Sequence, residues 1–98
     1  MPPRSQANGR KRPIIANRLG LHTRPAAKLV QTASNFHSDV FLQIEGEEVD
    51  AKSILGVLQM GAAQGTELIL RCDGEDEGEA LDAIAGLFED GFGEGVEK

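Results

Sequence analysis

One histidine in this sequence lies in a setting suited to phosphoryl chemistry. His22 comes directly before an expected helix, within the segment LGLHTRPAA of residues 19–27. A helix N-terminus carries unbonded N–H groups and a partial positive charge, which together suit a phosphate. Arg24 adds a cation whose planar fork matches phosphate oxygens, and Gly20 lets the backbone pass close by. Because an imidazole can attack a phosphoryl group and leave it again, the segment predicts a histidine that carries a phosphate.

The competing interpretation of this segment is a structural histidine beside a solvated Arg24. A second candidate is Ser53, at the start of a short expected helix over residues 54–58. Its first role is to cap that helix, and a helix N-terminus would also stabilise a phosphoserine there. The residues that follow include five apolar side chains, Ile54, Leu55, Val57, Leu58 and Met60. They either pack inward or form a docking patch for a partner, and both interpretations stay open.

Other site chemistries have little basis in the sequence. His22, His37 and Cys72 lack the spacing of metal ligands, so no metal site is expected. Cys72 is interpreted as a small buried apolar residue. The acidic run at residues 73–79 is interpreted as a solvated turn and helix start, since acids there complement the helix dipole.

The elements that must position His22 follow from hydrophobic periodicity and turn signals. Thr23 is expected to cap the first helix, with Pro25 in its first turn. Alternating or apolar runs predict strands over residues 11–17, 38–45, 47–51 and 67–72, and helical periodicity predicts helices over residues 23–34, 54–58 and 76–89. This order predicts an α+β domain with one small, mainly antiparallel sheet that carries its helices on one face.

The charge of the chain is distributed unevenly. The 98 residues carry a formal net charge of −6, and the length limits the chain to one domain. Residues 1–12 hold four basic residues and no acid, residues 13–72 are nearly neutral, and residues 73–98 hold ten acids and one base. We expect a disordered basic tail over residues 1–10, a domain over residues 11–91 and a flexible acidic tail over residues 92–98.

The composition excludes several classes of protein. No apolar run approaches the roughly 18 residues of a membrane span, and the basic start lacks the apolar region of a secretory signal. The single cysteine cannot form an internal disulfide, which favours the cytoplasm. Net negative charge, with neither Trp nor Tyr to stack on bases, argues against nucleic-acid binding.

LGLHTRPAA, together with AKSILGVLQMGAAQGTEL at residues 51–68, resembles the HPr family of histidine phosphocarriers in the phosphoenolpyruvate-dependent phosphotransferase system. The resemblance runs from about Arg12 to Glu89. It implies an open-faced β-sandwich, in which a four-stranded antiparallel sheet carries three helices on one side in the order βαββαβα. NRLGLHTRP and LFEDGFGE look like the nitrogen-related NPr branch, whereas KSILGVLQMGAAQGTE looks like the sugar-system HPr, so both branches stay open.

The resemblance also implies roles for individual residues. His22 corresponds to the histidine that is phosphorylated on Nδ1, and Arg24 to the arginine that assists transfer. Beside these, the residues themselves assign Gly20 and Thr23 to the helix N-terminus that is expected to stabilise the phosphate. Ser53 corresponds to the target of an ATP-dependent HPr kinase. The implied docking surface for partners comprises Lys28, Lys52, Ile54, Leu55, Leu58 and Met60.

The function that the resemblance implies is phosphoryl transfer from phosphoenolpyruvate through enzyme I to His22, and then to an EIIA-type acceptor. It also implies a substrate of enzyme I rather than a stand-alone enzyme. A monomer is expected of so small a carrier that must meet several partners in turn, and neither a cofactor nor insertion into a membrane is expected. The alternative is a regulatory binding protein in which phosphorylation of His22 or Ser53 switches docking. A third possibility is a scaffold domain in which His22 is only a neighbour of the helix cap.

Overall fold

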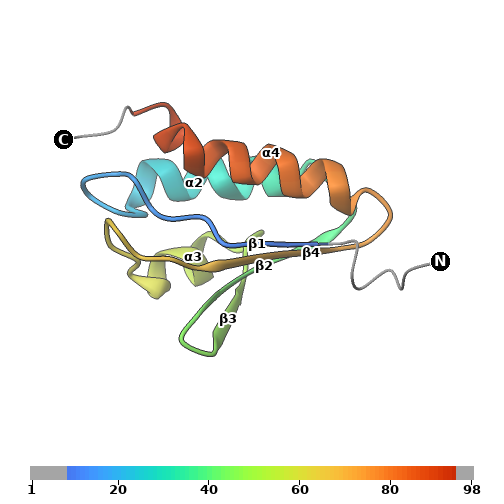
Figure 1. Cartoon of the computed structure of the whole chain (residues 1–98), viewed down its shortest axis with the longest axis horizontal. Helices are drawn as coiled ribbons and strands as arrows, with labels where there is room; N and C mark the ends of the chain where they lie inside the picture. The colour runs from blue at the N-terminus through green and yellow to red at the C-terminus, as the bar shows by residue number, and fades with distance from the viewer. Residues whose placement is uncertain (1–8, 95–98) are drawn as a thin grey trace.

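The computed structural model describes residues 9–94 of the chain. Its elements follow in the order β1 (Arg10–Lys11), α2 (Thr23–Ala33), β2 (Asp39–Ile44), β3 (Glu47–Asp50), α3 (Ile54–Met60), β4 (Ile69–Asp73), α4 (Glu77–Glu89) and the 3-10 turn η1 (Gly91–Gly93). The strands form one antiparallel sheet in the order β1-β4-β2-β3. Helices α2 and α4 lie side by side across one face of the sheet, and α3 packs against α2 and β3 (Figure 1). The predicted α+β fold is therefore confirmed.

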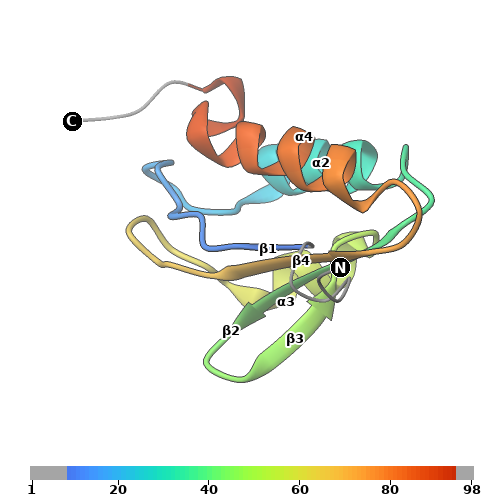
Figure 2. The same cartoon turned by 45° about the vertical axis from the view of Figure 1, so that its right-hand side comes forward.

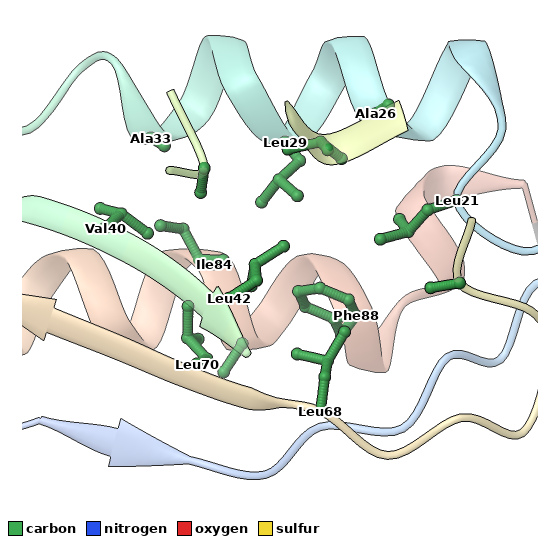
Figure 3. Close-up of a cluster of buried hydrophobic side chains, with 14 of the residues drawn as sticks. Leu21, Ala26, Leu29, Ala33, Val40, Leu42, Leu68, Leu70, Ile84 and Phe88 are labelled. Carbon is green, nitrogen blue, oxygen red and sulfur yellow. The ribbon is translucent and has the colours of Figure 1, made fainter. Parts of the chain in front are cut away.

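The core lies between the sheet and the two long helices. Along β2, alternate residues Val40 and Leu42 face the helices and are fully buried, as the period of two predicts. Figure 3 shows that the inward side chains of the sheet meet those of both helices. The buried cluster also takes in Leu21 before α2 and Leu68 before β4; its labelled members are Leu21, Ala26, Leu29, Ala33, Val40, Leu42, Leu68, Leu70, Ile84 and Phe88. Burying a large apolar side chain contributes about 1.5–3 kcal/mol, so this layer holds α2 and the residues at its start in place.

The opposite face of the sheet carries no helix from the described residues. Arg71 lies there over the Phe41 ring, 4.4 Å from its centroid, and pairs with the Glu48 carboxylate at 3.1 Å. Strands β2 and β3 are joined by the tight turn that the sequence predicts, with positive φ at Glu45 and Gly46. Figure 2 shows this hairpin extending away from α2 and α4.

The first strand is shorter than the sequence predicts. In place of a strand over residues 11–17, β1 pairs with β4 and an isolated bridge joins Ile14 to Glu67. Pro13 lies between the two and lacks the N–H group that a continuous ladder needs. Its carbonyl still accepts a hydrogen bond from the Leu68 N–H at 3.1 Å, so the segment stays beside the chain that leads into β4.

The predicted helices are all present, but the N-cap of α2 and the end of α3 differ from the predictions. The N-cap of α2 is His22 rather than Thr23, because the His22 carbonyl accepts the first helical bond, from the Ala26 N–H at 3.0 Å. The predicted cap of α3 is confirmed, since Ser53 Oγ accepts from the Gly56 N–H at 3.1 Å. Helix α3 continues two residues beyond its expected end and stops at Gly61, which has a left-handed backbone conformation.

Two residues of the acidic run have structural roles beyond the solvated turn that the sequence predicts. Asp76 accepts hydrogen bonds from the Ser38 hydroxyl at 2.5 Å and from the backbone N–H groups of Ser38 and His37 at 2.8 and 2.9 Å. Glu77 is buried and accepts from the Gly74 N–H at 2.9 Å. The bonds of Asp76 connect the loop before β2 to the start of α4, and the bond of Glu77 holds the turn after β4 against the same helix start.

The described fold extends past both expected boundaries of the domain. The Gly9 carbonyl accepts from the Cys72 N–H at 3.1 Å, which continues the pairing of β1. Phe92 is only 3% exposed, and its ring packs edge-on against Phe88 with centroids 4.9 Å apart. Burial of this aromatic side chain explains why the chain stays folded beyond residue 91. The remainder of the two expected tails, residues 1–8 and 95–98, lies outside the described residues.

Candidate functional site

The position of His22 is set by the loop that precedes α2. Gly20 has a φ of 69°, and its Cα lies so close to the Ala62 carbonyl oxygen that a Cβ would overlap it. The next residue, Leu21, donates its N–H to the same carbonyl at 3.0 Å and buries its side chain in the core. The loop is thereby held against the segment after α3, and His22 follows with its side chain 33% exposed.

The first turn of α2 provides N–H groups directly beside His22. Thr23 and Arg24 occupy its first two positions, where the backbone N–H has no intrahelical acceptor. Pro25 occupies the third position and has no N–H to offer. Both Thr23 and Arg24 are exposed. Two backbone donors and one guanidinium therefore lie where a phosphoryl group on His22 would need positive charge.

A carboxylate from the far end of the chain contacts the other side of the imidazole. His22 Nε2 lies 3.2 Å from the Glu94 carboxylate. Asn17 donates from Nδ2 to Glu94 Oε1 at 2.8 Å and to the Gly91 carbonyl at 2.7 Å. The hydrogen bond from Asn17 lowers the pKa of Glu94, and the nearby His22 and Arg24 lower it further. Glu94 is therefore ionised at neutral pH.

A shallow depression opens beside His22. Its volume is about 330 Å³, and it is bounded by apolar residues of the loop before α2 and of the end of α3. The lining residues are Leu19, Leu21, His22, Thr23, Leu58, Gly61, Ala62 and Ala63. Leu19 on its rim is 72% exposed, so its apolar side chain adds to the surface beside His22. The surface around the histidine is thus largely apolar.

The structure divides the apolar residues of α3 between the two interpretations that the sequence left open. Val57 is buried, and Leu58 and Met60 are half-buried against the core. Ile54 and Leu55 are exposed, the latter by 63%. Packing therefore accounts for part of the apolar stretch, and its first two residues face solvent.

The two lysines of the expected docking surface are both bonded within the chain. The Lys28 ammonium donates to the Phe92 carbonyl at 3.2 Å, and the Lys52 ammonium donates to the Phe36 carbonyl at 2.9 Å. Arg24, in the first turn of α2 beside His22, is exposed, and its side chain makes no hydrogen bond among the described residues. Among residues 9–94, no cluster of three or more His, Cys, Asp or Glu side chains could hold a metal ion. None of the helices in this part of the chain has the length and apolar character to cross a membrane.

Comparison with known proteins decides the family. Residues 10–90 match the family described as "PTS HPr component phosphorylation site". The chain belongs to the HPr family. The family's members are phosphocarriers of the phosphotransferase system, and the resemblance drawn from LGLHTRPAA and residues 51–68 is confirmed.

Similar HPr proteins cover nearly the whole described domain. The phosphocarrier protein HPr of Xylella fastidiosa strain 9a5c is 53% identical over 81 residues, which are 83% of this chain and 91% of that protein. The crystal structure of HPr from Thermoanaerobacter tengcongensis is 42% identical with a TM-score of 0.85, and the alignment covers 89% of this chain and 98% of that one. An HPr dimer from the same organism is 46% identical with a TM-score of 0.72, covering 82% and 92%.

Three residues at the candidate site were not predicted from the sequence. Asn17 is a buried amide in an otherwise apolar segment, and that contrast was the one local signal for it. Leu19 reads as an ordinary core residue until its exposure is known. Glu94 lies 72 residues from His22 within the acidic end of the chain, where nothing in the sequence sets it apart from its neighbours.

Proposed function

We propose that this HPr-family chain accepts a phosphoryl group from phosphorylated enzyme I on Nδ1 of His22 and passes it to an EIIA-type acceptor. The observation that supports this most directly is the position of His22 as the N-cap of α2, where its half-buried side chain lies beside two backbone N–H groups and Arg24. Family membership supports the same conclusion, since the HPr family carries phosphoryl groups in the phosphotransferase system.

The chemistry asks little of the carrier beyond position and charge. The bond between the donor and phosphorus breaks, its electron pair returns to the donor, and the lone pair of His22 Nδ1 forms the new P–N bond. A neutral imidazole needs no base to attack, so the site needs no proton acceptor. The N–H groups of Thr23 and Arg24, with the Arg24 guanidinium, offset the negative charge on the transferred oxygens.

The apolar surface beside His22 is the part of the site that partners would contact. It combines the depression next to the histidine with the exposed side chains Leu19, Ile54 and Leu55. Enzyme I and the EIIA-type acceptor each need their own histidine close to His22, and a shared apolar face lets them dock in turn. In this proposal the chain is a cytoplasmic monomer between encounters.

Ser53 gives the carrier a second, regulatory site in this proposal. Its hydroxyl lies at the N-terminus of α3, directly before the exposed Ile54 and Leu55. A phosphate added by an HPr kinase would be stabilised by the helix N-terminus and would place about two negative charges beside the apolar docking residues. Phosphorylation of Ser53 would therefore weaken docking while leaving the fold intact.

The decisive experiment is a phosphotransfer assay with purified enzyme I and labelled phosphoenolpyruvate. The parent chain should acquire an acid-labile, alkali-stable label and pass it on when an EIIA-type acceptor is added. His22→Ala should acquire none, and His37→Ala, which alters an exposed histidine, should behave like the parent. Comparing a sugar-specific with a nitrogen-related acceptor identifies the branch. Normal labelling of His22→Ala would refute the proposal.

A further inference from the structure

The last turn of the described chain lies against the start of α2. Helix α4 ends at Glu89, and the chain then reverses through Gly91 and Phe92, which both have positive φ. The buried Phe92 ring anchors the reversal, and Lys28 of α2 donates to the Phe92 carbonyl at 3.2 Å. As Figure 1 shows, this turn lies at the N-terminal end of α2. Glu94 follows it and reaches the imidazole of His22.

Glu94 is held in place by a buried amide. Asn17 is 1% exposed, and its Nδ2 donates both to Glu94 Oε1 and to the Gly91 carbonyl. One amide group thus ties the carboxylate and the backbone of the turn together. Both Glu94 oxygens lie 3.2 Å from His22 Nε2, so the carboxylate covers that nitrogen.

The chemistry of the two groups determines which imidazole nitrogen carries the proton. An ionised carboxylate only accepts hydrogen bonds, so Nε2 must donate to it. A neutral histidine carries one N–H, and with that proton on Nε2 the lone pair is on Nδ1. The contact with Glu94 therefore leaves Nδ1 as the nucleophilic atom.

We propose that Glu94, oriented by Asn17, is a positioning residue that makes Nδ1 of His22 the reactive nitrogen by covering Nε2 and holding the proton there. This inference rests on the proposed phosphocarrier function. When Nδ1 forms its bond to phosphorus, Nε2 keeps its proton and the ring becomes positively charged. That charge develops against the Glu94 carboxylate, which stabilises it. In the reverse step the P–N electron pair returns to Nδ1, and the original hydrogen bond is restored.

The test uses a small phosphoryl donor, so that it does not depend on enzyme I. Chain labelled with ¹⁵N is incubated with potassium phosphoramidate, and NMR measures how much phosphate each histidine carries on Nδ1 and on Nε2. His37 is exposed and serves as the internal reference for the intrinsic preference of the reagent. In the parent, the Nδ1 to Nε2 ratio at His22 should exceed the ratio at His37 by about tenfold or more, the effect expected of one hydrogen bond to a charged group.

Three variants identify the cause of that selectivity. In Glu94→Ala the ratio at His22 should fall about tenfold, to that of His37. Glu94→Gln can still accept from Nε2 through its carbonyl oxygen, so it should retain selectivity well above that of the alanine variant. Glu89→Ala removes an exposed carboxylate at the end of α4 and should leave the ratio at His22 unchanged.

An unchanged ratio at His22 in Glu94→Ala, or a parent ratio equal to that of His37, would overturn the inference. The same spectra establish whether each variant is folded. If Glu94→Ala is unfolded, Glu94→Gln is compared with the parent at increasing ionic strength instead. The Nδ1 to Nε2 selectivity at His22 should then persist, because the contact with residue 94 is direct. Failure of enzyme I to label the parent refutes the phosphocarrier function and leaves the phosphoramidate result standing. The two outcomes are thus distinguishable.

Discussion

Gly20 and Ala62 touch backbone to backbone, with no room for a side chain between them. The contact joins the loop that carries His22 to the segment after α3, which carries part of the apolar surface. It explains why the two sequence motifs of the family, separated by some thirty residues, form one site. The position of the histidine relative to α3 depends on this contact.

Gly20→Ala should therefore damage both stability and transfer. The new methyl group would meet the Ala62 carbonyl, and the positive φ would itself be strained, so we expect a loss of about 2 kcal/mol or more in the free energy of unfolding. Gly46→Ala is the matched control, because Gly46 has a φ of 86° with open space around it and should cost about 1 kcal/mol. Urea unfolding measures both. Equal losses would mean that the contact with Ala62 is easily relieved.

Arg24→Ala should slow phosphoryl transfer without loosening the fold. The side chain is exposed and takes no part in the core, so the unfolding free energy should change by about 0.5 kcal/mol or less. Loss of the cation beside the transferred group should lower the rate from enzyme I by about 10²-fold. Arg18→Ala removes another exposed cation, from the preceding loop, and is the control for net charge. A rate equal to that of the parent would exclude Arg24 from the site.

Substitutions at Ser53 should separate its capping role from its regulatory role. Ser53→Ala loses the bond from the Gly56 N–H and should destabilise the domain by about 1 kcal/mol, with normal transfer rates. Ser53→Asp can cap the helix as well as serine does, so stability should be kept, while its charge beside Ile54 and Leu55 should raise the KM for enzyme I. Parent-like kinetics of Ser53→Asp would argue against control through this residue.

Asp76 should make the domain sensitive to acid. Hydrogen bonds, chiefly from the Ser38 hydroxyl and the His37 N–H, lower the pKa of Asp76 from 3.8 to about 2. A lowered folded-state pKa means that the ionised group stabilises the fold above the unfolded value and that this contribution is lost as the pH falls from about 4 to about 2. Asp76→Asn should therefore be less stable than the parent at pH 7, and the difference should shrink over that range in thermal unfolding. Asp73→Asn, at an exposed position, is the control; a pH-independent difference for Asp76→Asn would contradict the prediction.

Sequence reasoning succeeded where local patterns determine the structure. The burial of Val40 and Leu42, the turn at Glu45 and Gly46 and the cap at Ser53 each depend on residues within a few positions of one another. Two local predictions were wrong: the α2 cap at Thr23, and the length of the first strand, where the apolar residues after Pro13 suggest pairing that the missing N–H interrupts.

The candidate site was predictable only in part, because some of its contacts join residues that are far apart in the sequence. The segment around His22 and Arg24 was recognisable from the sequence, because a histidine and an arginine at the start of a helix are residue types that suit phosphate chemistry. The contact between Glu94 and His22 depends on the burial of Phe92 and on the reversal of the chain around it, which arise only in the folded domain. The Lys52 ammonium was expected at the docking surface, and its hydrogen bond to the Phe36 carbonyl likewise arises only in the folded domain.

Cys72 gives this domain a built-in reporter of its own opening. It is the single cysteine of the chain, it lies in β4 beneath α4, and burial together with the nearby Glu77 and Asp76 raises its pKa to about 11. A thiol reagent acts on the thiolate, so at neutral pH the folded protein should react very slowly. The labelling rate then measures how often the sheet and α4 separate, and comparing it with and without phosphate on His22 would reveal whether carrying the phosphoryl group tightens or loosens the carrier.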